Sequence, residues 1–219
     1  MGVSLLDIYG NPYIGVLCRA NEETAIVPFH IQEKERGVIE TALGVKARPM
    51  LVGGASILGS LCVMNSKGAL LPHFCSEEDV SALKGSLRVG VLPSKHTACG
   101  NNILANDRAA LINPEYDTKS REIIRDILDV EVMEGTIAGL ETVGSVAYVT
   151  SKGMLVHPKA MPEEIESLDS LFKIPIKKTT ANYGTPFIGA CLIANTKGAV
   201  IGSLSTGIEI GNIEESLYL

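Results

Sequence analysis

The stretch at residues 58–72 reads LGSLCVMNSKGALLP, and its pattern decides the fold. A glycine opens an apolar run, a four-residue turn follows, and a second apolar run comes after the turn. Within the turn, the side chain of Asn65 can bond to its own backbone, and Gly68 can adopt the left-handed conformation that ends the turn. The stretch therefore predicts a β-hairpin.

The same pattern occurs five times along the chain of 219 residues, at intervals of 41 to 45 residues. Its anchor glycines are Gly15, Gly59, Gly100, Gly144 and Gly189. Six residues after each anchor comes a residue that can open a turn: Asn21, Asn65, Asn106, Thr150 or Asn195. A period of this length is typical of a ring or array of supersecondary units.

The composition suits a chain that buries a full core, because 46% of the residues are apolar. The net charge of −6 and the absence of Trp argue against a dedicated nucleic-acid binder. The longest apolar runs have the length of strands, so we predict no membrane span. Five cysteines form no CxxC pair and no signal peptide is evident, so we expect a cytoplasmic protein with reduced thiols.

A short amphipathic helix is predicted after each hairpin, because apolar residues recur there at helical spacing. The five stripes are Val38, Ile39, Ala42 and Leu43; Val80, Leu83 and Leu87; Ile123, Ile124, Ile127 and Leu128; Ile165, Leu168, Leu171 and Phe172; and Ile210, Ile213 and Leu217. Ser76 resembles an N-cap, Pro162 suits a first helical turn, and Gly44 is a helix stop. A third strand is predicted after each of the first four helices, at residues 45–51, 87–92, 130–133 and 174–177.

The fifth helix ends at the C-terminus, with no strand after it. We expect residues 4–9 to supply the missing strand, which would join the chain ends, close the ring and remove exposed sheet edges. The predicted fold is an α/β, five-fold pseudosymmetric propeller or toroid with strands inside and helices outside. We expect a single domain of five repeats, at about 11–52, 53–93, 94–139, 140–182 and 183–219, with 1–10 completing the last blade.

Three stretches of the later repeats are distinctive. They read SKHTACGN at residues 94–101, VGSVAYVT at 143–150 and GACLIANTKGAV at 189–200. Together they resemble the translation initiation factor 6 family, in particular its archaeal branch, and the resemblance covers essentially the whole chain in register. Two positions depart from the family pattern. Ile208 stands where the family has Pro in Thr-Gly-Pro-Glu, and Cys99 stands where it has Leu.

The resemblance implies the pentein fold, which matches the toroid predicted from the repeats. It also implies binding to the large ribosomal subunit on its subunit-joining face, where the family prevents association with the small subunit and takes part in late large-subunit maturation. The implied partners are a ribosomal protein on that face and the sarcin–ricin loop region of the rRNA. Such a mechanism is steric, so we expect no catalytic residue, no cofactor and no small-molecule substrate.

Equivalent positions of a five-fold ring meet on one face, so the residue after each anchor glycine is a candidate for ribosome binding. We predict contacts at Ser60, Asn101, Ser145 and Ala190. Val16 occupies the equivalent position in the first repeat. The alternative is that small residues relieve crowding near the axis, which is the favoured interpretation for the glycines. Asn101 favours binding, because an amide is awkward to bury there and the resemblance places it on the ribosome-facing side.

The hairpin tips form a second candidate ring. Lys67, Arg108, Lys152 and Lys197 occupy equivalent positions, whereas the first repeat has Glu23. These basic side chains could contact rRNA phosphates even in an acidic protein. The alternative is that a solvated Lys simply suits an exposed turn.

A third candidate is the polar loop at residues 177–185, which leads into the fifth repeat. We predict ribosome contacts from Asn182, Tyr183 and Thr185, because an exposed Tyr favours a protein partner. An ordinary surface loop is the alternative.

Two other functions stay open. Some pentein-fold enzymes modify guanidinium groups with a Cys nucleophile, which needs a thiolate with a His in reach. Here Cys99 is close in sequence to His96, while His30, His73 and His157 occupy nearly equivalent positions on different blades and are not expected to converge. A scaffold for a non-ribosomal partner would share the same ring. No His/Cys ligand spacing occurs, so we predict no metal site. No complete phosphate-binding loop occurs either.

Overall fold

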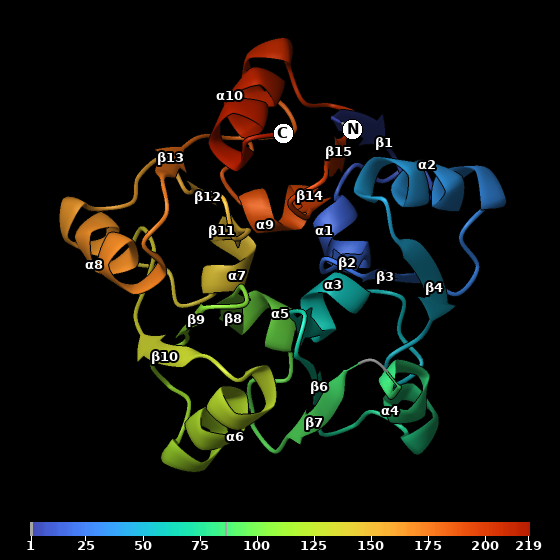
Figure 1. The fold of residues 1–219 in the computed structure, drawn as a ribbon, viewed down its shortest axis with the longest axis vertical. Coiled ribbons are helices and arrows are strands. Elements are labelled where there is room, and N and C mark those ends of the chain that lie inside the picture. The colour runs from blue at the N-terminus through green and yellow to red at the C-terminus, as the bar shows by residue number, and fades with distance from the viewer. Residues whose placement is uncertain (1, 86) are drawn as a thin grey trace.

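The computed structural model describes residues 2–85 and 87–219, and these residues form five three-stranded β-sheets of the same design. In each sheet the first two strands of a repeat form an antiparallel hairpin, and a third strand lies parallel to the second. The strand orders are β2-β3-β4, β5-β6-β7, β8-β9-β10, β11-β12-β13 and β14-β15-β1. Figure 1 shows the five sheets around a common centre, consistent with five-fold pseudosymmetry.

The strands are short, as the apolar runs predict. Their bounds are β1 (Val3–Leu6), β2 (Arg19–Ala20), β3 (Thr24–Pro28), β4 (Lys46–Met50), β5 (Val63–Met64), β6 (Gly68–Pro72), β7 (Arg88–Leu92), β8 (Ile103–Ala105), β9 (Ala109–Ile112), β10 (Glu131–Glu134), β11 (Ala147–Val149), β12 (Met154–Val156), β13 (Ile176–Lys178), β14 (Leu192–Ala194) and β15 (Ala199–Gly202). Both strands of every hairpin are buried along their whole length, so these apolar strands are covered on both faces.

Longer helices occupy the periphery of the molecule (Figure 1). They are α2 (Glu33–Leu43), α4 (Glu77–Leu83), α6 (Thr118–Leu128), α8 (Pro162–Phe172) and α10 (Gly207–Leu217). The predicted signals at their ends are confirmed. The Ser76 hydroxyl accepts from the Asp79 N–H in a capping box, Pro162 opens α8, and Gly44 follows α2 with a left-handed φ of 60°.

One helical prediction is wrong at its end. The stripe of Val80, Leu83 and Leu87 predicts a helix through Leu87, but α4 ends at Leu83. Leu87 is buried outside the helix, directly before β7. Leu87 lies in the segment between α4 and β7. Because it is buried there, its position in the sequence resembles the next turn of the apolar helical stripe.

The centre holds a second class of helix, each a single turn. These helices are α1 (Ile14–Leu17), α3 (Leu58–Leu61), α5 (Cys99–Asn102), α7 (Val143–Val146) and α9 (Ile188–Cys191). Each contains one anchor glycine, so the prediction that the anchors begin strands is wrong. A single turn is too short to show helical periodicity, and it runs directly into the apolar inner strand.

The one-turn helices approach so closely that their backbones touch. A Cβ added to Gly59 would lie 1.9 Å from the backbone oxygen of Gly15, and one on Gly100 would lie 1.9 Å from that of Gly59. The same relation continues through Gly144 and Gly189 and returns from Gly15 to Gly189. Each anchor is therefore a glycine because a neighbouring backbone occupies the place of its side chain.

The N-terminal strand joins the last sheet, as predicted. β1 runs parallel to β15, from Val3 beside Ala199 to Leu6 beside Gly202. Both chain ends consequently lie close together in Figure 1. The expectation that this pairing removes the sheet edges is wrong, because the sheets of the described residues stay separate and each keeps an outer edge strand. The helices and inner turns, rather than strand pairing, connect neighbouring sheets.

Asparagine side chains link the hairpin turns across blades. The Oδ1 atom of Asn65 accepts hydrogen bonds from the N–H groups of Lys67 and Gly68 at 3.0 and 2.9 Å, which builds its own turn. Its Nδ2 atom donates to the carbonyls of Asn106 and Leu128 in the next blade at 3.1 and 2.9 Å. We call the equivalent set of Asn21, Asn65, Asn106 and Asn195 the amide ring.

Each member of the amide ring donates to the next turn. Asn21 donates to Asn65 at 2.8 Å, Asn106 to Thr150 at 3.0 Å, and Asn195 to Asn21 at 3.2 Å. Thr150 has no amide to continue the series. In its blade the Nζ atom of Lys152 instead reaches the Thr196 carbonyl at 2.7 Å.

Replacing Asn65 with alanine is expected to lower the free energy of unfolding by about 2–4 kcal/mol, because four hydrogen bonds, three of them buried, lose a partner. Denaturant unfolding followed by circular dichroism measures the change. Asn212→Ala is the control, since the Asn212 amide makes a single long contact of 3.5 Å among the residues that the structure describes. Equal effects of the two substitutions would contradict a structural role of the amide ring.

Candidate binding face

The residues after the anchor glycines lie within the one-turn helices around the centre. Asn101, Ser145 and Ala190 are partly exposed there, whereas Ser60 is buried. The structure therefore brings this predicted set together around the centre, with Ser60 the least accessible member. The adjacent side chain, Asn102, is buried and donates to the Ala98 carbonyl at 2.9 Å, so Asn101 is the amide of this pair that faces outward.

The predicted loop of the fifth repeat divides into a buried and an exposed part. Asn182 is buried, and its Nδ2 atom donates to the Pro12 carbonyl at 2.9 Å while its backbone N–H donates to the Ser205 hydroxyl at 2.9 Å. Thr185 donates to the Asn182 carbonyl at 3.2 Å. Tyr183 is 83% exposed. Asn182 thus binds the loop to the start of the chain, and Tyr183 is the residue of the loop that faces solvent.

A buried carboxylate holds this loop in place. Glu209, in the first turn of α10, is 5% exposed and accepts hydrogen bonds from the backbone N–H groups of Gly184 at 2.8 Å and Tyr183 at 3.2 Å. It also accepts from the Thr180 hydroxyl and the Thr206 N–H, at 2.7 and 2.8 Å. Burial opposes ionisation of Glu209, but these hydrogen bonds outweigh it and lower its pKa.

Glu209→Gln is expected to lower the free energy of unfolding by about 2 kcal/mol at pH 7, because the donors lose a charged acceptor. The folded state lowers the pKa of Glu209 below its ordinary value of 4.5, so the carboxylate stabilises the protein above that pH. The stabilisation is lost as pH falls through the folded-state pKa. Denaturant unfolding of both proteins between pH 7 and 3 measures this. The gap between them should narrow below about pH 4.5, and a constant gap would refute the assignment.

The fifth repeat and the chain start carry several exposed apolar side chains on neighbouring segments. Ile208 is 80% exposed and Leu204 is 59% exposed. Hydrogen bonds join the segments that carry them: Glu209 binds the Tyr183 backbone, Asn182 binds Pro12, and Ser203 binds Asp7. We name this set the junction patch, and its residues are Tyr9, Tyr13, Tyr183, Phe187, Leu204 and Ile208. Exposed apolar groups on adjoining segments can form a protein-binding surface.

Leu204 and Ile208 were not predicted from the sequence as exposed binding residues. A signal existed for Ile208, since it lies in the first turn of α10 outside the stripe of Ile210, Ile213 and Leu217. An apolar residue outside the core stripe of an amphipathic helix is free to face solvent. Leu204 lies between β15 and α10 and carried no comparable signal.

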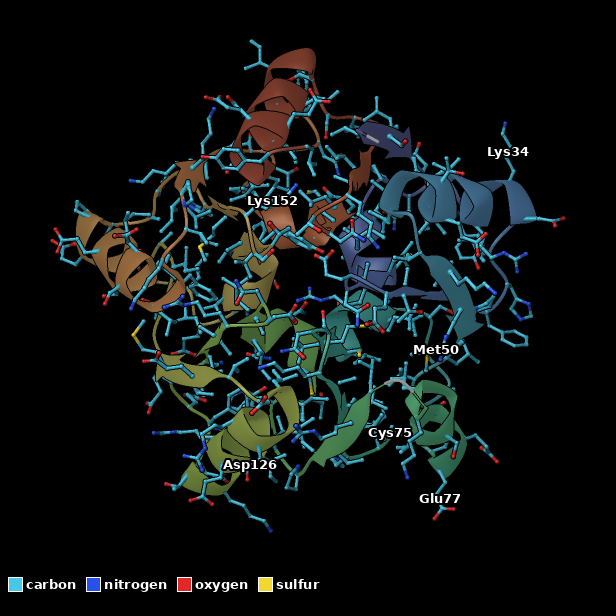
Figure 2. The ribbon with its side chains drawn as sticks, viewed as in Figure 1. Lys34, Met50, Cys75, Glu77, Asp126 and Lys152 are labelled. Atoms are coloured by element: carbon cyan, nitrogen blue, oxygen red, sulfur yellow. The ribbon has the colours of Figure 1, made fainter. Side chains whose placement is uncertain are left out.

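Three of the four basic hairpin tips contact the neighbouring blade. The Nζ atom of Lys67 lies 2.7 Å from the Asp129 carbonyl and 3.0 Å from its carboxylate, and that of Lys197 lies 2.6 Å from the Glu22 carbonyl. Lys152 binds the carbonyls of Thr196 and Tyr218 at 2.7 and 3.2 Å, and Figure 2 shows it toward the centre. The contacts with Asp129 and Tyr218 place Lys67 and Lys152 at the C-termini of α6 and α10, where positive charge is favourable.

Arg108 differs from the other tips. Within residues 2–85 and 87–219, no hydrogen bond or ion pair of its guanidinium is found. It remains the tip with the most freedom to contact an external phosphate. The tips and the one-turn helices lie at opposite ends of the inner strands, as β14 shows between Cys191 and Asn195. The predicted contacts therefore belong to two separate regions of the surface.

Residues 3–216 match the sequence model described as the eIF-6 family. The chain belongs to the eIF-6 family. It is 42% identical over 215 residues to the Translation initiation factor 6 of Methanosarcina mazei, covering 98% of each chain. It is 41% identical over 224 residues to the protein of that name from Pyrococcus horikoshii, covering 99% of each. For Methanocaldococcus jannaschii the identity is 44% over 218 residues, covering 96% of this chain and 95% of the relative.

The thiols of this eIF-6 family chain are poorly suited to nucleophilic catalysis. Cys99 is buried, and burial raises the pKa of its thiol far above the ordinary value of 9.0. Burial likewise raises the pKa of Cys191 to about 12. In the described part of the chain, no hydrogen bond joins a cysteine to a histidine. The Nε2 atom of His96 lies instead 3.2 Å from a carboxylate oxygen of Glu115. All five cysteines are free thiols.

Across residues 2–85 and 87–219, no group of three His, Cys, Asp or Glu side chains is arranged to hold a metal ion. Over the same residues, every helix is too short or too polar to cross a membrane.

Proposed function

We propose that this protein acts in translation initiation by binding the large ribosomal subunit on its subunit-joining face and preventing association with the small subunit. A part in late large-subunit maturation, a cytoplasmic location and the absence of enzymatic activity belong to the same proposal. It rests on membership of the eIF-6 family and on relatives named Translation initiation factor 6. The structural observation that carries it is the exposed, firmly held junction patch.

The partner at the junction patch is proposed to be a ribosomal protein. Tyr, Phe, Leu and Ile side chains provide apolar contact area, and aromatic residues are enriched at protein interfaces. Glu209 and Asn182 hold the loop before binding, so little conformational freedom is lost on association. The rRNA near the sarcin–ricin loop is proposed as a second, lesser contact.

The mechanism is steric exclusion by a stiff body. We propose that the five repeats form one domain, a pentein-type propeller, because the anchor glycines touch in a circuit and the hairpin turns bind one another through the amide ring. A body built in this way cannot easily deform to let another subunit dock beside it. An interface of ordinary size is sufficient for tight binding.

Sedimentation through a sucrose gradient tests the proposal. The purified protein is mixed with separated archaeal ribosomal subunits at two salt concentrations. We expect it to migrate with the large subunit only and to reduce the amount of joined ribosomes. Weak salt dependence would support a protein partner, whereas strong dependence would support phosphate contacts, for which Arg108 is the first candidate. Absence of co-migration at both salt concentrations would refute the proposal.

Asn101→Arg is expected to weaken binding to the large subunit by about 10-fold or more, because a bulky charge enters the partly exposed α5 turn beside the centre. The fold should persist, since Asn101 is not a member of the core. Co-sedimentation measures binding, and circular dichroism checks folding. Wild-type binding by the folded variant would remove Asn101 from the binding face.

A further inference from the structure

A buried arginine occupies the centre of the molecule. Arg19 in β2 is only 5% exposed, and in the other four repeats the equivalent position holds an uncharged residue: Val63, Leu104, Tyr148 or Ile193. Its guanidinium lies over the Tyr148 ring, 5.8 Å from the ring centre. Among residues 2–85 and 87–219, it makes no hydrogen bond and no ion pair. The guanidinium nitrogens of Arg19 keep some solvent-accessible surface, so water or an anion can reach them and supply the acceptors that the described residues do not.

The guanidinium borders a small central cavity of about 40 Å³. The walls are the ends of the inner strands and the hairpin turns, including Asn21, Asn106, Tyr148 and Thr150. This volume accommodates more than one water-sized body. A guanidinium has five N–H donors, and an occupant of this cavity could accept hydrogen bonds from those of Arg19.

The carboxylates that line the cavity, Asp107 and Glu22, form no ion pair with Arg19. Asp107 accepts hydrogen bonds from the Ser66 N–H and hydroxyl at 2.7 and 2.8 Å. Glu22 accepts from the Thr196 N–H and hydroxyl at 3.0 and 2.6 Å. Both acids are thus held by the neighbouring hairpin turn, and neither lies within ion-pair distance of the guanidinium.

Further donors border the cavity. The amides of Asn21 and Asn106 each donate one hydrogen bond to a neighbouring turn, which leaves a second N–H on each Nδ2 atom. In the fourth repeat, Thr150 replaces the longer asparagine and so removes one amide from the ring. The departures from five-fold symmetry, Arg19, Tyr148 and Thr150, thus border the same space.

We infer that the central cavity binds a small monovalent anion of the size of chloride, held by the Arg19 guanidinium. An anion can accept hydrogen bonds from the guanidinium and pair with its charge at contact distance, whereas water supplies only hydrogen-bond acceptors. The site is separate from the junction patch and independent of the proposed function.

Bromide provides a direct test on the unaltered protein. Crystals grown in sodium bromide are measured at the bromine absorption edge. We expect an anomalous peak in the central cavity, within hydrogen-bonding distance of the Arg19 guanidinium. Density without anomalous signal in the cavity would mean that water alone occupies it and would overturn the inference.

Thermal unfolding provides a second test. At constant ionic strength, sodium chloride is compared with sodium gluconate, whose anion is too large for the cavity. The unfolding midpoint of the wild type is expected to be about 2–4 °C higher in chloride, because a ligand that binds only the folded state stabilises it. The difference should disappear in Arg19→Met, which keeps the length of the side chain and removes its charge.

Two further variants serve as controls. Arg19→Lys keeps the charge, so it should retain part of the chloride dependence and serves if Arg19→Met folds poorly. Lys34→Met removes a positive charge from the surface of α2, where Figure 2 shows Lys34 pointing outward. This control should behave like the wild type. Equal chloride dependence in the wild type and Arg19→Met would assign the effect to the surface and overturn the inference.

Discussion

Gly59→Ala is expected to prevent the protein from reaching its native structure or to lower its free energy of unfolding by at least about 3 kcal/mol. The new methyl group would lie 1.9 Å from the Gly15 backbone oxygen and 2.3 Å from that of Cys18. Neither atom can move away alone, because each belongs to a turn that is packed against another turn. Expression yield, circular dichroism and denaturant unfolding together measure the effect.

Gly37→Ala is the matched control for this substitution. Gly37 lies within α2, and a Cβ added there meets no atom within 4 Å. Alanine is a better helix former than glycine, so this variant should be more stable than the wild type by about 0.5–1 kcal/mol. If Gly59→Ala were tolerated as well as Gly37→Ala, the close approach of the one-turn helices would be wrong.

Replacing both Tyr183 and Ile208 with aspartate is expected to weaken binding to the large ribosomal subunit by about 100-fold. Both side chains are more than three-quarters exposed, so their loss should leave folding intact. The two carboxylates would have to be desolvated against an apolar partner, and the contact area of the ring and the aliphatic chain would be lost. Co-sedimentation over a range of protein concentrations measures the affinity.

Val91→Asp is the control for the effect of an acidic residue elsewhere on the surface. Val91 is an exposed apolar residue of β7, in the second sheet and outside the junction patch. This variant should bind like the wild type. Full binding by folded Tyr183→Asp/Ile208→Asp protein would exclude the junction patch as the ribosomal contact and would leave the face around Asn101 as the candidate.

The repeat pattern predicted much of the architecture because hairpins and helices depend on residues close together in the chain. An asparagine six residues after a glycine was enough to locate each of four hairpin turns, and the apolar stripes located the outer helices. The N-terminal strand was predictable because the last repeat lacked one. The one-turn helices were not, since four residues give no periodic signal.

The candidate site was predicted only in part. Tyr183 was located as an exposed aromatic, but Asn182 in the same loop is a buried structural residue. The basic tips were predicted as solvent-facing side chains, whereas Lys67, Lys152 and Lys197 contact carbonyls in the neighbouring blade. Whether a polar side chain faces outward or binds a neighbour depends on which segment lies beside it, and the repeat pattern does not state that.

The sequence by itself determined the five-fold repetition, the hairpins, the outer helices and the pairing of the chain ends, because each follows from local patterns repeated at a constant interval. Only the tertiary structure decided which backbone atoms crowd the anchor glycines, that Leu204 and Ile208 lie on segments adjoining Tyr183, and that the guanidinium of the mostly buried Arg19 has no hydrogen-bond partner among the described residues. These features arise from contacts between distant segments, such as Asp7 with Ser203, separated by 196 residues. Close packing brings such segments together, and the local periodicity of the sequence does not predict their contact.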